Sequence, residues 1–172
     1  MTVGASNWYT NTIDAATTTG VGIRNIPYYD NLMVLWSMSF QPTADIPILT
    51  FNFDSLNTPC WWRLVSAASG VSTLTNSQQA SNTDLSVRLI TTSAVNQTMS
   101  GVVFINNVEN ARGERTMTIN GVSSNVGGGT FLSTGVGARK GVNQPIYSIS
   151  LRGAGLQVVS SARLAVFGSN II

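Results

Sequence analysis

The sequence predicts an all-β fold: an antiparallel jelly-roll-like β-sandwich of eight or nine strands with an extended N-terminal arm. Its composition is the first reason, because only 9% of the 172 residues are charged while 20 are Ser, 19 Thr and 16 Asn. Long surface helices draw on Glu, Lys and Arg, whereas Thr suits a pleated strand and Ser and Asn suit turns. The second reason is spacing, because apolar and polar residues alternate in short runs bounded by Gly, Pro, Asn or Ser.

The longest predicted strand covers residues 30–40, after a shorter run around residues 21–23. Large apolar side chains occupy its even-numbered positions: Leu32, Val34, Trp36, Met38 and Phe40. On the other face, Met33 and Leu35 predict a start that is buried on both sides, before Ser37 and Ser39 make that face polar.

The remaining strands are predicted at 48–54, 60–66, 85–92, 101–107, 114–120, 146–152 and 163–167. Their apolar phases predict a core that contains Leu32, Val34, Trp36, Leu49, Phe51, Leu89, Val103, Ile149 and Val166. Two long segments lack a strand period and are expected to be loops: 67–84, rich in Ser, Thr, Asn and Gln, and 120–144, rich in glycine.

The domain organisation follows from the same pattern. Residues 1–18 have no period and form the extended arm, and residues 19–172 form one sandwich domain. The arm carries Trp8 and Tyr9, two large aromatic side chains among small polar ones. Such an arm either lies over its own domain or reaches a neighbouring subunit, and both alternatives are open.

Several functions are disfavoured by what the sequence lacks. It has no His and one cysteine, Cys60, which excludes a Ser-His-Asp triad, a thiolate metal cluster and an intrachain disulfide. A net charge of +2 gives no reason to expect a nucleic-acid partner. No apolar run approaches the roughly 20 residues of a membrane span, and no signal peptide is recognisable. We therefore expect synthesis in the cytoplasm, no membrane or nucleic-acid partner, no cofactor and no enzymatic activity.

The polar residues that could be taken for functional residues have structural explanations. Asn52, Asp54 and Asn57 are too sparse for a calcium loop, so hydrogen bonds in a turn explain them better and no metal site is predicted. Arg139 and Lys140 lie in the glycine-rich segment and are expected to form a solvated cationic loop tip.

Trp61 and Trp62 are adjacent on a predicted strand and must therefore face opposite ways. One is expected in the core. The other is expected to face solvent, a loop, a sugar or a protein partner, and the sequence does not separate these alternatives.

Four segments, in order, resemble a family of small bacteriophage virion proteins with a jelly-roll-like domain. They are residues 24–32 (RNIPYYDNL), residues 49–55 with the aromatic strand at 61–64, residues 146–151 (IYSISL) and residues 160–168 (SSARLAVFG). The resemblance spans roughly residues 21–168. It implies a virion domain of the type found as head decorations, head fibres and tail-fibre tips.

The resemblance implies a structural function. We expect a capsid decoration protein on the outside of a phage head, bound to the major capsid protein and assembled as a homo-oligomer, with a trimer favoured. The alternative is a receptor-binding tip that recognises a glycan on the host surface. The residues expected at the interface are Trp8, Tyr9, Trp61, Trp62, Arg139 and Lys140.

Overall fold

The computed structural model describes residues 8–13, 19–41, 43–52, 60–68, 74–79, 86–91, 98–108, 113–124, 129–140, 144–155 and 158–170. These residues form twelve strands: β1 (Trp8–Ile13), β2 (Gly20–Ile23), β3 (Asn31–Phe40), β4 (Pro47–Phe51), β5 (Cys60–Ala68), β6 (Leu74–Gln79), β7 (Ser86–Arg88), β8 (Met99–Asn106), β9 (Glu114–Ser124), β10 (Thr130–Lys140), β11 (Ile149–Gly153) and β12 (Val159–Ser169). The all-β prediction is confirmed, with twelve strands in place of eight or nine.

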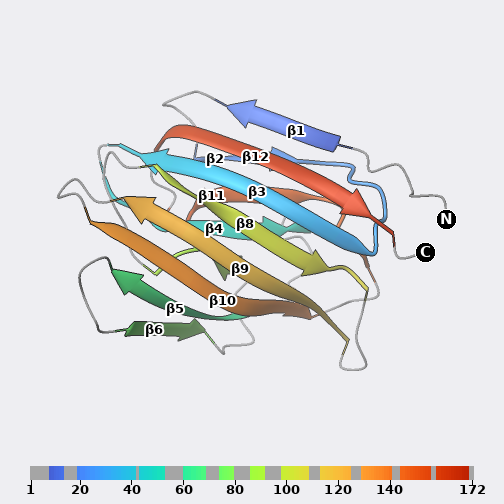
Figure 1. Cartoon of the computed structure of the whole chain (residues 1–172). Coiled ribbons are helices and arrows are strands. Elements are labelled where there is room, and N and C mark those ends of the chain that lie inside the picture. The colour runs from blue at the N-terminus through green and yellow to red at the C-terminus, as the bar shows by residue number, and fades with distance from the viewer. Residues whose placement is uncertain are drawn as a thin grey trace.

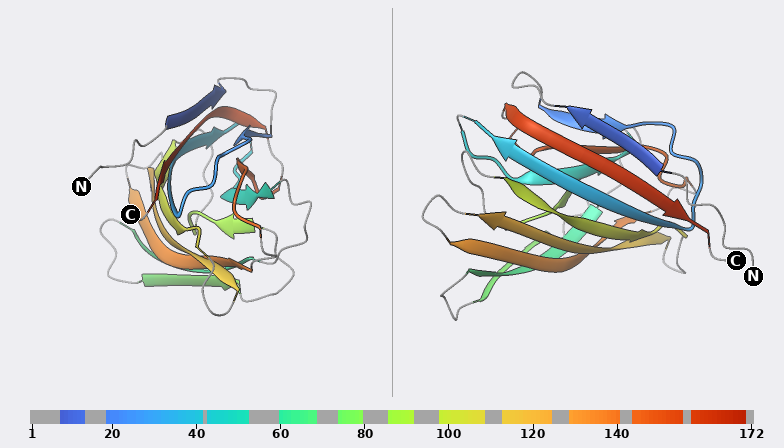
Figure 2. Two further views of the ribbon diagram at one scale, coloured as in Figure 1. Left: turned by 90° about the vertical axis from the view of Figure 1, so that its right-hand side faces the viewer. Right: turned by 45° about the horizontal axis from the view of Figure 1, so that its top comes forward.

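The strands form two antiparallel sheets that pack face to face (Figure 1). The large sheet has eight strands in the order β1-β12-β3-β8-β9-β10-β5-β6, and the small sheet has the order β2-β11-β4-β7. Figure 2 shows the large sheet curving around the small one, so that its concave side faces the core. The convex side of the large sheet is therefore the broad outer face of the sandwich.

The jelly-roll character lies in how the chain moves between the sheets. Successive strand pairs nest inside one another: β2 with β11, β3 with β8, β4 with β7, and β5 with β6. This nesting is that of a two-stranded ribbon rolled into a sandwich. Where an eight-stranded roll would place a single strand between β3 and β5, this chain places the meander β8-β9-β10.

The core fills the space between the sheets as the alternation predicts. All nine predicted core residues are buried in one hydrophobic cluster: Leu32, Val34, Trp36, Leu49, Phe51, Leu89, Val103, Ile149 and Val166. In β3 the even-numbered apolar positions from Leu32 to Phe40 all face this cluster, so the predicted phase of the strand is confirmed.

Two segments predicted as loops contain strands instead. β6 lies within 67–84, and β10 lies within 120–144 together with the end of β9. In β10 glycine does not break the strand. A Cβ atom at Gly135 would overlap the carbonyl oxygen of Arg63 on β5, so glycine lets the two strands lie close together.

The predicted N-terminal arm is partly integrated into the domain. Residues 8–13 form β1, which pairs with β12 from Trp8 opposite Phe167 to Ile13 opposite Ala162. Of this strand only the backbone is described, so the prediction that Trp8 and Tyr9 contact another chain concerns side chains outside the described part. The rest of residues 1–18, apart from β1, also lies outside it.

Candidate functional site

In the described part of the chain, most of the exposed large hydrophobic side chains lie on the outer face of the large sheet. Among the described residues, eight large hydrophobic side chains are exposed. Five of them point outward from this one sheet: Leu35 (41%), Leu74 (69%), Phe104 (48%), Leu132 (61%) and Val136 (47%). The other three, Tyr28, Val108 and Val158, lie in connections. Scattered exposed hydrophobic residues are normal on a protein surface, but a contiguous set on one face indicates an interaction site.

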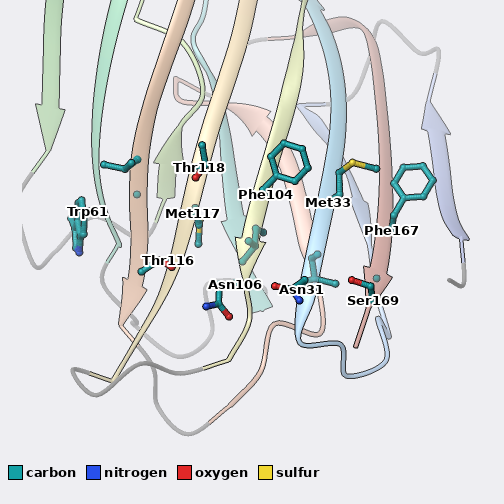
Figure 3. Close-up of a pocket in the computed structure, with 15 residues that line it drawn as sticks. Asn31, Met33, Trp61, Phe104, Asn106, Thr116, Met117, Thr118, Phe167 and Ser169 are labelled. Carbon is teal, nitrogen blue, oxygen red and sulfur yellow. The ribbon is translucent and has the colours of Figure 1, made fainter. Parts of the chain in front are cut away.

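Strand register places these side chains in rows across the sheet. In one row Phe167, Met33 and Phe104 lie opposite one another on β12, β3 and β8. The row continues through Thr118 on β9 to Val136 on β10. Figure 3 shows Phe167, Met33 and Phe104 side by side on neighbouring strands. Side chains directly opposite each other across strands have Cβ atoms only about 4.5–5.5 Å apart, so Phe167, Met33 and Phe104 form a continuous apolar strip, which Thr118 separates from Val136.

The outer face is hollowed in two places. The first hollow, about 910 Å³, is lined by the apolar row together with Trp61, and amide groups of Asn31 and Asn106 lie at one end (Figure 3). The second, about 660 Å³, lies toward the opposite ends of the strands, and its apolar lining includes Leu35, Val102 and Leu132.

Charge is confined to the rim of the outer face. The outward side chains of β3 and β8, in the middle of the sheet, are all uncharged. Arg163 on β12 and Arg63 on β5 are exposed at the sides, and Glu114 and Lys140 lie opposite each other at the ends of β9 and β10. An apolar centre with a polar rim is the usual anatomy of a protein–protein interface.

The two adjacent tryptophans face opposite ways, as predicted. Trp62 is buried in the core, and the Arg88 guanidinium lies 5.0 Å from the centroid of its ring. Trp61 is half-buried at the first hollow, where its indole Nε1–H donates a hydrogen bond of 3.3 Å to Oε1 of Glu114. Trp61 therefore belongs to the outer face, and burial removes Trp62 from the predicted interface set.

Arg139 and Lys140, the other adjacent pair of predicted interface residues, also point to opposite faces of their strand. The interpretation of Arg139 as a solvated loop cation is wrong, because β10 runs through residue 140 and places Arg139 on its inward phase. Its side chain is fully buried, and its Nη1 donates to the carbonyl oxygen of Gln144 at 3.4 Å. Lys140 is exposed at the end of the strand and remains a rim residue.

The residues considered for a metal site hold the fold together where they are described. Asn52 is buried at a positive φ of 53°, and its Oδ1 accepts hydrogen bonds from the backbone N–H groups of Tyr147 (2.9 Å) and Ser148 (3.2 Å). Asp54 and Asn57 lie outside the described residues. Within the described ranges, no three His, Cys, Asp or Glu side chains lie together as metal ligands, and no helix is long and apolar enough to cross a membrane.

Sequence reasoning missed the outer face as a site. Its signal is present in Met33 and Leu35, whose apolar side chains predict that the start of this strand is buried on both sides. Instead Met33 is half-buried and Leu35 is exposed. Apolar residues on both phases of a strand predict either a second covering layer or a surface that meets a partner. In the described part of the chain, no layer of the domain covers this face.

Comparison with known proteins finds no matching family model, no matching curated protein and no matching solved structure. The function proposed below therefore depends on the geometry of the outer face and on the sequence resemblance.

Proposed function

We propose that this chain is a structural, non-enzymatic protein that docks onto another protein through the outer face of its large sheet. One observation carries the proposal: five of the eight exposed large hydrophobic side chains in the described residues lie on this face. Removing apolar surface from water is favourable by roughly 25 cal/mol for each Å², and this gain opposes the entropic cost of association. The uncharged centre of the face also leaves no charge to desolvate when it binds.

The partner that we propose is the major capsid protein of a bacteriophage, which would make the chain a decoration protein on the outside of the head. The sequence resemblance to small virion proteins supports this choice. The sandwich suits the role physically, because the broad convex face of the large sheet can contact capsid subunits while the small sheet stays on the far side.

The test is binding to empty heads assembled from the major capsid protein encoded in the same genome. Wild-type protein should co-sediment with the heads. Val136→Ser, on the outer face, should weaken binding about tenfold if the side chain is fully buried in the contact, since it removes two methyl groups that each contribute about 0.8 kcal/mol when buried. Val158→Ser is the matched control, because Val158 is similarly exposed (40% against 47%) but lies in the connection before β12. Equal binding by both variants would place the docking surface elsewhere, and no binding by wild-type protein would refute the capsid as partner.

A glycan-binding tip is the second candidate, and Trp61 is the observation that favours it. Its half-buried indole and the amides of Asn31 and Asn106 line the same hollow. Aromatic faces stack on sugars, and amides hydrogen-bond to hydroxyl groups. On an array of bacterial surface glycans, a glycan-binding tip would retain a defined set of sugars, and Trp61→Ala would lose it. A decoration protein would retain none.

A further inference from the structure

The large sheet ends in a strand whose outer edge is available for pairing. β6 is the last strand in the order, and no other strand in the described part of the chain lies beyond it. It pairs with β5 over six consecutive residue pairs, from Trp62 opposite Gln79 to Ala67 opposite Leu74, without a bulge. Figure 1 shows β6 at the edge of the sheet opposite to β1.

Natural proteins protect such edges from pairing with a second chain. They do so with charged side chains, proline, β-bulges or very short strands. β6 has the sequence LTNSQQ, with no charge and no proline. The small sheet, by contrast, ends in β7, which has only three residues and includes Arg88. Among the described residues, this edge of the large sheet therefore lacks the features that would protect it from pairing with another strand.

We propose that β6 pairs with β6 of a second copy of this chain, antiparallel across a twofold axis perpendicular to the sheet. The sheet then continues from one copy into the other. A twofold contact is self-complementary. β6 suits such a contact because it carries no charged side chain, so no like charges meet when it pairs with β6 of the second copy. This contact uses the strand edge and goes beyond the docking of the outer face proposed above.

Sheet geometry limits the pairing to a few registers. Residues directly opposite each other must point to the same face of the continuous sheet, so the twofold axis must pass through a residue rather than between two. The axis at Asn76 places residue 74 opposite 78 of the partner copy, and the axis at Ser77 places residue 75 opposite 79. Each of these two registers pairs five residues of the strand, more than any other choice of axis.

The outer side chains of β6 also fit this arrangement. Asn76 and Gln78 are exposed. With the axis at Asn76, the two Asn76 amides lie opposite each other. With the axis at Ser77, each Asn76 amide lies opposite the Gln78 amide of the other copy, and in both registers the paired amides can donate and accept hydrogen bonds. Leu74, the most exposed large hydrophobic residue in the described part of the chain, points to the outer face. Pairing at β6 would therefore join the apolar outer faces of two copies into one surface.

The first test is the mass of the purified full chain, measured by sedimentation velocity over a range of concentrations. A concentration-dependent dimer is expected. The double variant Asn76→Lys/Gln78→Lys places like charges opposite each other in both registers, and it should raise the dimer dissociation constant at least tenfold. The matched control Gln41→Lys/Thr43→Lys adds the same charges at two exposed positions after β3, away from the edge. It should leave the dimer unchanged.

The second test uses disulfide cross-linking and does not depend on how well the lysine variant folds. Under oxidising conditions, Asn76→Cys should form a dimer if the axis lies at that residue, and Ser77→Cys if it lies at the next. Gln41→Cys is the control and should give no disulfide-linked dimer, since residue 41 lies away from β6 and the native Cys60 is buried. The proposal would be overturned by a monomer at all concentrations, or by a trimer or ring. It would also be overturned by a dimer that the control lysines disrupt and the β6 lysines do not.

The docking of the outer face and the pairing of β6 are tested by different measurements, so either can be refuted without the other. Val136→Ser should weaken head binding and leave the dimer mass unchanged, because Val136 lies on β10, two strands away from β6. Loss of the dimer in the double-lysine variant of β6 is measured from its mass, in the absence of phage heads.

Discussion

Phe104 and Met33 lie directly opposite each other on β8 and β3, and both side chains point out of the domain. Phe104 is 48% exposed although it stands at the centre of the large sheet. Cross-strand apolar pairs of this kind contribute about 0.2–1 kcal/mol to stability. The pair thus stabilises the sheet only slightly, and the exposed half of the Phe104 ring is left for a partner.

The coupling between these two residues is measurable. A double-mutant cycle with Met33→Ala and Phe104→Ala should give an interaction energy of about 0.2–1 kcal/mol in urea unfolding. A control cycle with Met33→Ala and Leu132→Ala should be additive, because Leu132 lies three strands away, roughly 14 Å across the sheet. Additivity in the first cycle would show that Met33 and Phe104 do not pack together.

The two adjacent tryptophans should differ in their contribution to stability. Trp62→Ala removes a buried ring from the core and should lower the free energy of unfolding by about 3–5 kcal/mol. Trp61→Ala should cost clearly less, because this ring is half-buried and only covers the outer face. Chemical denaturation monitored by circular dichroism gives both values, and equal losses would contradict the assigned facing.

Asn107 should be essential for the fold although its neighbour Asn106 is not. The buried Asn107 amide donates to the carbonyl oxygen of Tyr29 (2.9 Å) and accepts from the N–H of Ile146 (3.0 Å). Asn107→Ala leaves two buried backbone groups unsatisfied and should cost about 2–4 kcal/mol. Asn106→Ala removes one exposed hydrogen bond, which its Oδ1 accepts from the N–H of Val108 (3.1 Å), and should cost no more than about 1 kcal/mol. Thermal unfolding of the two variants makes the comparison, and similar melting temperatures would contradict it.

Gly168 should tolerate no side chain. A Cβ atom there would overlap the buried ring of Tyr29, so Gly168→Ala should destabilise the protein by about 1–3 kcal/mol. At Gly155 a Cβ atom would make ordinary contacts of 3.5 Å or more with the Asp45 carboxyl group, and Gly155→Ala should be nearly neutral. If both variants unfold at the same denaturant concentration, Tyr29 does not lie against Gly168.

Tyr28 should ionise at a higher pH than an ordinary tyrosine. Its hydrogen bond to the Asp30 side chain, with some burial and the carboxylate charge, raises its pKa above 10.0. The neutral phenol is thus favoured in the folded state, so its contribution to stability is present below about pH 10 and is lost as the pH rises through the raised pKa. Phenolate absorbance, taken as the difference from Tyr28→Phe, should titrate at lower pH in Asp30→Asn. An unchanged midpoint would exclude the Asp30 interaction.

The core could be predicted from the sequence because strand geometry leaves little freedom. Leu32, Val34 and Trp36 have a period of two, and a shift by one residue would expose the whole set. For the same reason it was predictable that Trp61 and Trp62 face opposite ways.

β10 and the outer face could not be predicted by the same reasoning. In the sequence, Gly135 indicates a break in a strand. Its structural role depends on the close approach of the Arg63 carbonyl oxygen on β5. The sequence predicts that Leu35 is a buried residue, because no local pattern distinguishes a face covered by the chain itself from a face left for a partner. Both outcomes depend on which strands become neighbours, and that is set by contacts distant in sequence.

A cryo-electron microscopy map of heads carrying the bound protein tests the central claim most directly. Fitting the sandwich into such a map should place the outer face of the large sheet on the capsid, with Met33, Phe104 and Val136 buried in the contact and the small sheet toward solvent. A map in which the small sheet contacts the capsid and the outer face remains in solvent would contradict the account.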